Sequence, residues 1–240
     1  METKKLGVLL LLAGIYAAHA FTEDAMKTPD LKDTRLEGPL AVKADRLFRN
    51  RIADPLMRET IFEEARRAFV LRDDDEDNGG AKGNWRGEFW GKSMLCAARV
   101  ADYLDDAALK AWIPGECARL AETADADGYI GSYASATNCV LTGADLDRDE
   151  CNTNWNLWGR KYTIWALLEA FRVTGDAAAR ATAVAQARHF IATVDRLAAR
   201  GVGLDDTGCH WLNGIPTMSI LKPMLLLYRE TKVPEFLAFA

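Results

Sequence analysis

The sequence predicts an all-α protein: an incomplete (α/α)6 toroid built of helical hairpins, with about half of the ring present. Long segments repeat their apolar residues at helical spacing, and alternating strand patterns are nearly absent. A similar motif stands near the end of three segments, at residues 103–106, 171–174 and 228–231, each followed by a short turn and another apolar segment. The helical hairpin is therefore the repeating unit. A ring of hairpins has an inner and an outer layer of helices around a central funnel, where we expect the functional site.

Residues 21–40 precede these hairpins and predict an extended lead-in, because they are polar, contain two prolines and show no period. Helices are then expected over about residues 41–71, 83–104, 107–123, 152–176, 176–199 and 217–231, with one more beginning at Pro234. Three of these helices contain a proline, which removes a backbone donor. Pro55 is expected to kink or divide the first helix, and Pro114 to kink or briefly break the third. Pro223 requires either a local kink or a later helix start.

Residues 152–176 form the central helix, which we expect to be long and largely buried with a polar entrance. Trp158, Tyr162 and Trp165 recur at helical spacing, and Gly175 stands where a glycine commonly ends a helix. Hydrogen-bonding groups and aromatic rings are crowded at the entrance, namely Asn154, Trp155, Asn156, Trp158, Arg160, Lys161 and Tyr162. Two interpretations remain open: a ligand site at the helix start, or core rings with solvated charges.

Three other features carry weaker predictions. The acidic run within residues 72–80 predicts a solvated loop, with cation binding as the alternative, because adjacent acidic residues do not define a coordination geometry. Residues 125–133 resemble a calcium loop, but Thr123 and Ala134 occupy two ligand positions, so we interpret the segment as a tight turn. His189 lies on an apolar helix face and is interpreted as a core residue with satisfied hydrogen bonds.

The composition excludes one class of function and favours another. The chain has 240 residues, of which 49% are hydrophobic, and a net charge of −5. This acidic balance without a basic cluster argues against a nucleic-acid partner. Seven tryptophans are a high count. Indole rings stack well on sugars, so the count favours carbohydrate handling, although large helical cores also use tryptophan.

Residues 1–20 predict a secretory signal peptide. Two lysines precede an apolar run over residues 6–17, and Ala18-His-Ala20 is a small-x-small cleavage site. The run is too short to span a bilayer comfortably, and no later segment is apolar enough. We therefore expect cleavage after Ala20 and a secreted or periplasmic protein that has no membrane association afterwards.

Export permits disulfides, and the chain has five cysteines. Cys96 and Cys117 occur in helical patterns and are expected to be small buried residues. Cys139 and Cys151 flank an acidic loop, and whether they form a disulfide stays open, because sequence does not show the geometry. No pair has zinc-site spacing, so no metal site is expected in this chain. Cys209 has no neighbouring cysteine or glutamate and is not assigned as a nucleophile.

Four motifs occur in order within residues 41–240. They are Gly87-Glu-Phe-Trp-Gly-Lys92, Asp127-Gly-Tyr-Ile-Gly-Ser-Tyr133, Trp155-Asn-Leu-Trp-Gly-Arg-Lys-Tyr162 with the trailing Phe171-Arg-Val-Thr-Gly-Asp176, and Ile215-Pro-Thr-Met-Ser-Ile-Leu-Lys-Pro-Met-Leu-Leu-Leu-Tyr-Arg229 ending in Phe236-Leu-Ala-Phe239. Together they resemble the N-terminal part of glycoside hydrolase family 127, the β-L-arabinofuranosidase group. The resemblance implies that residues 41–240 are the N-terminal portion of an (α/α)6 glycosidase domain, which β-sandwich domains follow in the family.

The resemblance also implies a reaction. Characterised members of the family remove terminal β-L-arabinofuranose with retention of configuration. A zinc-bound cysteine thiolate is the nucleophile, a glutamate is the acid/base, and further cysteines and a glutamate hold the metal. In the family these residues belong to the later half of the barrel. We therefore expect zinc in the full-length protein, catalytic residues beyond residue 240, and a 240-residue chain that is inactive alone and binds no metal.

Matching the motifs of the family assigns seven residues of this chain to substrate binding. They are Glu88, Trp90, Tyr129, Trp158, Lys161, Tyr162 and His210. The resemblance implies that the aromatic rings stack on a sugar of an arabinose-containing glycan, whereas the two charged residues and the histidine fix its hydroxyl groups.

Three functional hypotheses follow. The first is a fragment of a secreted glycoside hydrolase. The second keeps the α/α toroid but assigns it to a uronide hydrolase or polysaccharide lyase, whose activity would survive zinc chelation. The third is an inactive carbohydrate-binding paralogue that binds sugar without turnover. An open half-ring exposes apolar helix faces, so the first hypothesis predicts that the isolated chain aggregates.

Overall fold

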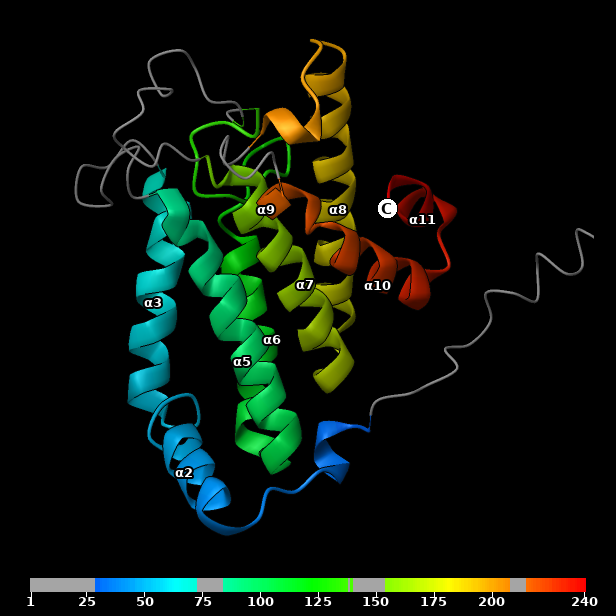
Figure 1. Ribbon diagram of the computed structural model, residues 1–240. Helices are drawn as coiled ribbons and strands as arrows, with labels where there is room; N and C mark the ends of the chain where they lie inside the picture. The colour runs from blue at the N-terminus through cyan, green and yellow to red at the C-terminus, as the bar shows by residue number, and fades with distance from the viewer. Residues whose placement is uncertain (1–28, 73–83, 138, 140–153, 208–214) are drawn as a thin grey trace, which may run out of the picture.

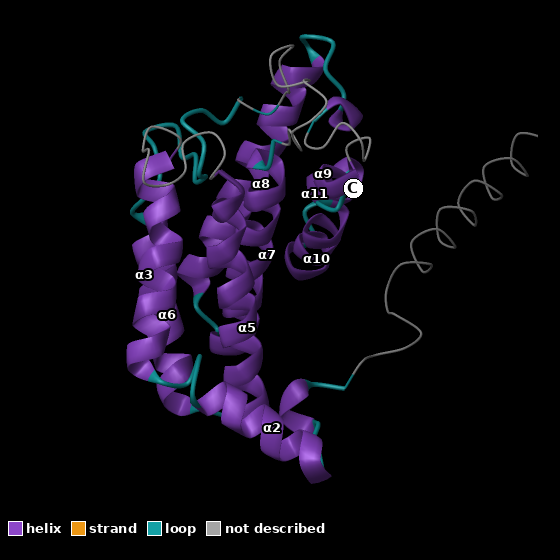
Figure 2. Ribbon diagram, turned by 60° about the vertical axis from the view of Figure 1, so that its left-hand side comes forward, coloured by secondary structure: helices purple, strands orange, loops and turns teal. Residues whose placement is uncertain are grey.

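Figure 1 shows the computed structural model, which describes residues 29–72, 84–137, 139, 154–207 and 215–240. The described residues contain helices and loops and no β-strand, as the colouring of Figure 2 makes clear. The all-α prediction is therefore confirmed for them. The predicted signal peptide, the acidic run from residue 73 onward, Cys151, Cys209 and His210 lie outside the described residues.

Ten helices of four or more residues follow one another in the described residues. They are α2 (Gly38–Arg49), α3 (Pro55–Leu71), η4 (Asn84–Gly87), α5 (Glu88–Leu104), α6 (Ala107–Ala121), α7 (Asn156–Thr174), α8 (Ala177–Ala198), α9 (Ile215–Met218), α10 (Leu221–Thr231) and α11 (Pro234–Phe239). Short 3-10 turns, η1 (Leu31–Asp33) and η6 (Leu204–Asp206), complete the set. Within the predicted lead-in, η1 is therefore helical and α2 already begins at Gly38, where an extended chain was expected.

The predicted hairpin repeat is present as three pairs, α5–α6, α7–α8 and α10–α11. The first helix of each pair ends in a left-handed residue, namely Asp105, Gly175 or Lys232. In the first two pairs an aspartate then caps the second helix: Asp106 accepts the backbone N–H of Leu109, and Asp176 that of Ala178. A left-handed C-cap next to an N-cap reverses the chain within two residues.

The helices form two layers. The first helices of the pairs, α5, α7 and α10, pack side by side in one layer, and α6 and α8 pack against each other in the second layer (Figures 1 and 2). Helix α3 packs on α5 at one side of the array. This two-layer arrangement is that of an incomplete α/α toroid. The N-terminal ends of α5 and α7 lie at the same end of the array (Figure 1).

The predictions made for the three prolines have different outcomes. Pro55 divides the first predicted helix, since α2 ends at Arg49 and α3 begins at Pro55 itself. Pro223 lies in the first turn of α10, which confirms the later helix start. At Pro114 a kink or a short break was expected, and the break is absent, because α6 runs without interruption from Ala107 to Ala121. The buried side chains of Leu109 and Leu120 hold α6 in the core on both sides of this proline.

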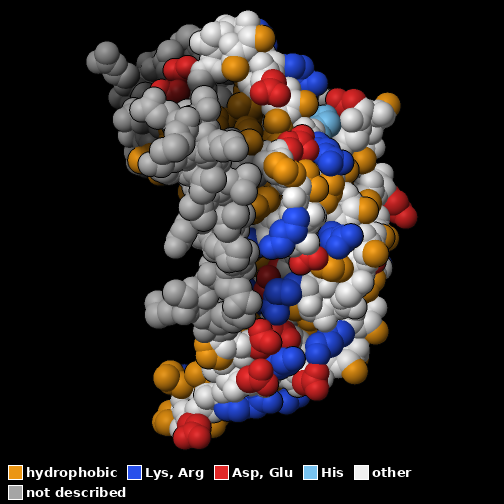
Figure 3. All heavy atoms as spheres, turned by 90° about the vertical axis from the view of Figure 1, so that its right-hand side faces the viewer, with side chains coloured by type: hydrophobic (Ala, Val, Ile, Leu, Met, Phe, Trp, Pro, Cys, Tyr) orange, Lys and Arg blue, Asp and Glu red, His pale blue; other side chains and the backbone are white. Residues whose placement is uncertain are grey.

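The core lies between the two layers, and its largest fully buried rings include Phe62, Trp90, Tyr129 and Phe190. On the face shown in Figure 3, acidic and basic side chains alternate instead of forming one basic patch. This face therefore lacks the single-sign surface typical of nucleic-acid binding. Among the described helices, none combines the length and apolar character needed to cross a membrane.

Candidate functional site

The site begins where the N-terminal ends of α5 and α7 approach each other closely. A Cβ atom on Gly91 would lie 2.5 Å from the backbone carbonyl carbon of Tyr162, and one on Gly159 would lie 3.2 Å from that of Gly87. Only glycine permits this backbone approach. It brings the first turns of the two helices together, so that side chains from both converge.

Five side chains converge there, and we call them the entrance cluster: Glu88 and Lys92 of α5, and Trp158, Lys161 and Tyr162 of α7. One carboxylate oxygen of Glu88 accepts the indole N–H of Trp158, and the other lies 2.7 Å from the Lys92 ammonium nitrogen. The Lys161 nitrogen lies 3.5 Å from the ring centre of Trp158 and 3.7 Å from that of Tyr162. Four of the seven predicted residues are therefore neighbours, and the carboxylate holds one of the rings in place.

Lys161 has the most strongly shifted pKa of the cluster. The residue is only 4% exposed, and burial lowers the pKa of its ammonium group to about 8. The nearby positive charge of Lys92 lowers this pKa further, whereas the negative charge of Glu88 opposes the shift. Among the described residues, the Lys161 ammonium contacts two ring faces but makes no hydrogen bond. Its three donors are therefore available to water or to a ligand.

Aromatic rings continue along the same face of α7. The Trp155 and Trp158 ring centres lie 5.8 Å apart, Trp158 meets Tyr162 edge-on at 5.1 Å, and Tyr162 stacks on Trp165 at 6.3 Å. All four residues are half-buried. The helix thus presents a row of partly accessible rings that begins at the entrance cluster.

Trp90 and Tyr129 need correction as sugar-contacting residues, because both rings are enclosed in the core. Trp90 is 0% exposed, and its indole N–H donates to Glu116 at 2.7 Å. Tyr129 is 1% exposed, and its hydroxyl donates to Asn156 at 3.3 Å. Both residues support the site from below: Trp90 anchors α5, and Tyr129 holds the first residue of α7. His210, the seventh predicted residue, lies outside the described residues.

His189 has the structural role expected from the sequence. Its Nδ1 accepts from the Arg160 guanidinium at 2.9 Å, and its Nε2 donates to Asp127 at 3.3 Å. Burial and the charge of Arg160 lower the pKa of the ring, so His189 is neutral at pH 7. The interpretation of His189 as a satisfied core residue is confirmed.

Sequence reasoning missed Lys92, although it lies inside the first quoted motif. It stands four residues after Glu88, the spacing at which helical side chains of opposite charge meet. It also missed Arg99 and Lys222, whose charged groups lie 5.5 Å and 4.1 Å from the ring centre of Trp165. The Lys222 contact joins α10 to α7, and nothing local in the sequence indicates it.

The described residues do not fit a zinc–thiolate centre. They contain no group of three histidine, cysteine, aspartate or glutamate side chains that could hold a metal ion. Cys117 is buried as predicted, whereas Cys96 is exposed on α5, so its predicted burial was wrong. Desolvation raises the pKa of all three thiols, that of Cys139 to about 12, so they stay protonated at neutral pH. Cys139 is a buried free thiol in the structure. Whether Cys139 pairs with Cys151 stays open, because Cys151 lies outside the described residues.

Comparison with known proteins agrees with this architecture. The family model described as "Beta-L-arabinofuranosidase, GH127 catalytic domain" matches residues 39–240. No curated protein and no solved structure matches the chain. The match covers every hairpin described above together with the entrance cluster. The chain therefore belongs to the glycoside hydrolase family 127 β-L-arabinofuranosidase catalytic-domain family.

Proposed function

We propose that this chain is the substrate-positioning part of a secreted glycoside hydrolase that removes terminal arabinofuranose from glycans. The observation that carries the proposal is the Lys161 ammonium, which lies between two aromatic faces with its hydrogen-bond donors available. The family match supports a carbohydrate substrate. A polar group placed among half-buried rings is the combination by which proteins orient sugars.

In the proposed complex, the C–H face of a sugar stacks on Trp158 or Tyr162. Lys161 donates to a hydroxyl group, and Glu88 accepts from another while it keeps its contact with Trp158. We place the cleavage chemistry outside the described residues, because these lack a zinc–thiolate centre. In this proposal the described part of the chain binds and orients the sugar and does not cleave it.

Replacing Lys161 by methionine tests the proposal, since methionine has a similar length and no donor. We expect the affinity for an L-arabinofuranose-containing oligosaccharide, measured by calorimetry, to fall about tenfold or more, because a hydrogen bond from a charged group is lost. Stability should be unchanged or higher, because a buried charge is removed. Lys43→Met on the exposed face of α2 is the matched control. An unchanged affinity of the Lys161→Met variant would contradict the proposed role.

The wild type and the Lys161→Met variant are expected to differ in how their stability and sugar affinity depend on pH. The pKa of Lys161 is about 8 in the folded chain and 10.5 as the ordinary value. Between these values the unfolded chain binds more protons, so the Lys161 contribution to stability rises with pH through this window. Sugar affinity should fall from pH 7 to pH 9, because the ammonium loses its charge. Urea unfolding and calorimetry at both pH values should show these trends in the wild type minus Lys161→Met difference.

We further propose that the chain is exported and that the signal peptide is cleaved after Ala20. The support is the basic start, the apolar run and the small-x-small site at residues 18–20. Mass spectrometry of the chain recovered from a secreting host is expected to give a mature N-terminus at Phe21. An intact Met1 in the exported material, or full retention in the cytoplasm, contradicts this.

A further inference from the structure

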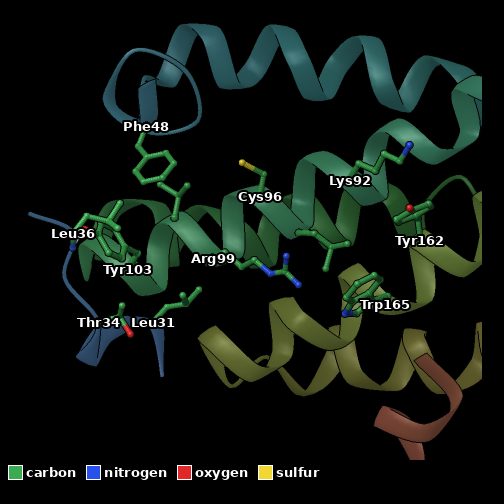
Figure 4. Close-up of a pocket in the computed structure, with 12 residues that line it drawn as sticks. Leu31, Thr34, Leu36, Phe48, Lys92, Cys96, Arg99, Tyr103, Tyr162 and Trp165 are labelled. Carbon is green, nitrogen blue, oxygen red and sulfur yellow. Dashed lines mark hydrogen bonds between the residues drawn. The ribbon is translucent and has the colours of Figure 1, made fainter. Parts of the chain in front are cut away.

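A cavity of about 640 Å³ continues from the entrance cluster along the side of α5 that faces α7. We call it the α5–α7 groove. Figure 4 shows Lys92, Arg99 and Tyr103 on α5, and Tyr162 and Trp165 on α7, around this space. The N-terminal segment closes its far end, where the backbone N–H of Leu36 donates to the Tyr103 hydroxyl at 3.0 Å.

The charge of the groove lining has one sign. Lys92 and Arg99 line the cavity, and no acidic side chain is among the described residues that do so. Their side chains are 43% and 47% exposed, so both charged groups reach open space. Lys222 adds a third positive charge beside Trp165 from α10. A cavity with this lining favours a ligand that carries negative charge.

Arg99 lines the groove and its charge is only weakly compensated. Its nearest carboxylate oxygen, on Glu169, lies 3.8 Å from Nε, beyond hydrogen-bond distance, and the same oxygen accepts from Arg172 at 3.1 Å. The Arg99 guanidinium lies 5.5 Å from the Trp165 ring centre, and Figure 4 shows both side chains between the two helices. An arginine fork with unused donors matches a carboxylate, and the neighbouring ring provides a face for stacking.

We propose that the α5–α7 groove binds a carboxylate-bearing sugar, a uronic acid residue of the glycan, with Arg99 as the partner of its carboxylate. The inference rests on the proposed carbohydrate function and narrows the substrate class from neutral to acidic glycans. The entrance cluster holds one sugar, and the groove holds the acidic residue next to it. Lys92 lies at the junction, because it pairs with Glu88 and also lines the groove.

The test compares digalacturonic acid with its methyl ester, which lacks the negative charge, by calorimetry with the protein. We expect the acid to bind about tenfold or more tightly than the ester, and this preference to shrink as salt is raised. Arg99→Gln should abolish the preference while it leaves the affinity for the ester unchanged. Arg99→Lys should retain part of it, because it keeps the charge and loses the fork. Arg200→Gln, at an exposed position after α8, is the control.

Three results would overturn the inference: equal affinities for acid and ester, a preference that survives in Arg99→Gln, or binding of neither probe. Neutral arabino-oligosaccharides separate it from the proposed function. If they bind through Lys161 and the acidic probe gains nothing, the proposed function stands and the acidic groove is rejected. If the acid binds through Arg99 and arabino-oligosaccharides do not bind, the groove is supported and the arabinofuranose specificity is rejected.

Discussion

Replacing Glu116 by alanine is expected to lower the free energy of unfolding by about 3–5 kcal/mol, the cost typical of breaking a buried ion pair. Glu116 is 0% exposed and lies on α6. One of its carboxylate oxygens accepts the indole N–H of Trp90 at 2.7 Å. The other pairs with Arg66 of α3 and lies 2.8 Å from a guanidinium nitrogen of Arg119. One carboxylate thus connects α3, α5 and α6.

The alanine variant leaves three groups without this acceptor, namely Trp90, Arg66 and Arg119. The Arg66 side chain is 17% exposed and the Trp90 ring is fully buried, so water reaches neither group well. Arg119 is 39% exposed and recovers part of its hydration, which limits the total effect. Urea unfolding followed by tryptophan fluorescence measures the change. Glu122→Ala, at an exposed position at the end of α6, should change stability by less than about 0.5 kcal/mol.

Glu116→Gln separates charge from hydrogen bonding. The amide oxygen still accepts from Trp90, but the ion pair is lost, so the variant should fall between wild type and Glu116→Ala. If Glu116→Ala lost less than about 1 kcal/mol, water or other groups would be compensating Arg66, and the cluster would not be the anchor of α5. A large loss of stability is expected to reduce sugar binding as well. Trp90 anchors α5, and the same helix carries Glu88 of the entrance cluster.

The hairpin architecture could be predicted from the sequence because the signals that make it are local. Gly175 takes the left-handed conformation that ends α7, and Asp176 caps α8 one residue later. The motifs at the other two hairpins use non-glycine residues, Asp105 and Lys232, in the same conformation. Position in the repeat identified these ends, whereas residue type alone would not have done so. The effect of Pro114 was not local, because packing on both sides holds α6 together.

The entrance cluster was predicted in part, and the helical period explains the division. Glu88 and Lys92 stand four residues apart and share a face, whereas Trp90 stands two residues from Glu88 and points away from it. The spacing alone could therefore have shown that Trp90 lies outside the entrance cluster. The burial of Tyr129 could not be predicted in this way, because it depends on Asn156 at the start of another helix. The α5–α7 groove likewise depends on contacts between elements distant in sequence.

Replacing Gly91 by alanine is expected to destabilise the chain by about 1–3 kcal/mol and to abolish sugar binding at the entrance cluster. The added methyl group would lie 2.5 Å from the carbonyl carbon and 2.6 Å from the carbonyl oxygen of Tyr162. These are backbone atoms of a buried helix and cannot rotate away, so α5 and α7 must separate. Separation pulls Glu88 from Trp158 and widens the space in which Lys161 meets both rings.

Gly115→Ala is the matched control, because it makes the same substitution in the interior of a neighbouring helix. Its Cβ would approach only the flexible end of Arg119, at 4.0 Å, and alanine has the higher helix propensity. This variant should therefore gain up to about 1 kcal/mol and keep full sugar affinity. Urea unfolding should therefore show that the free energy of unfolding falls in Gly91→Ala and rises in Gly115→Ala. This result would show that glycine at position 91 is needed for the close approach of α5 and α7. If Gly91→Ala kept wild-type affinity, the cluster would not depend on this approach, and the sugar would have to be held elsewhere on the chain.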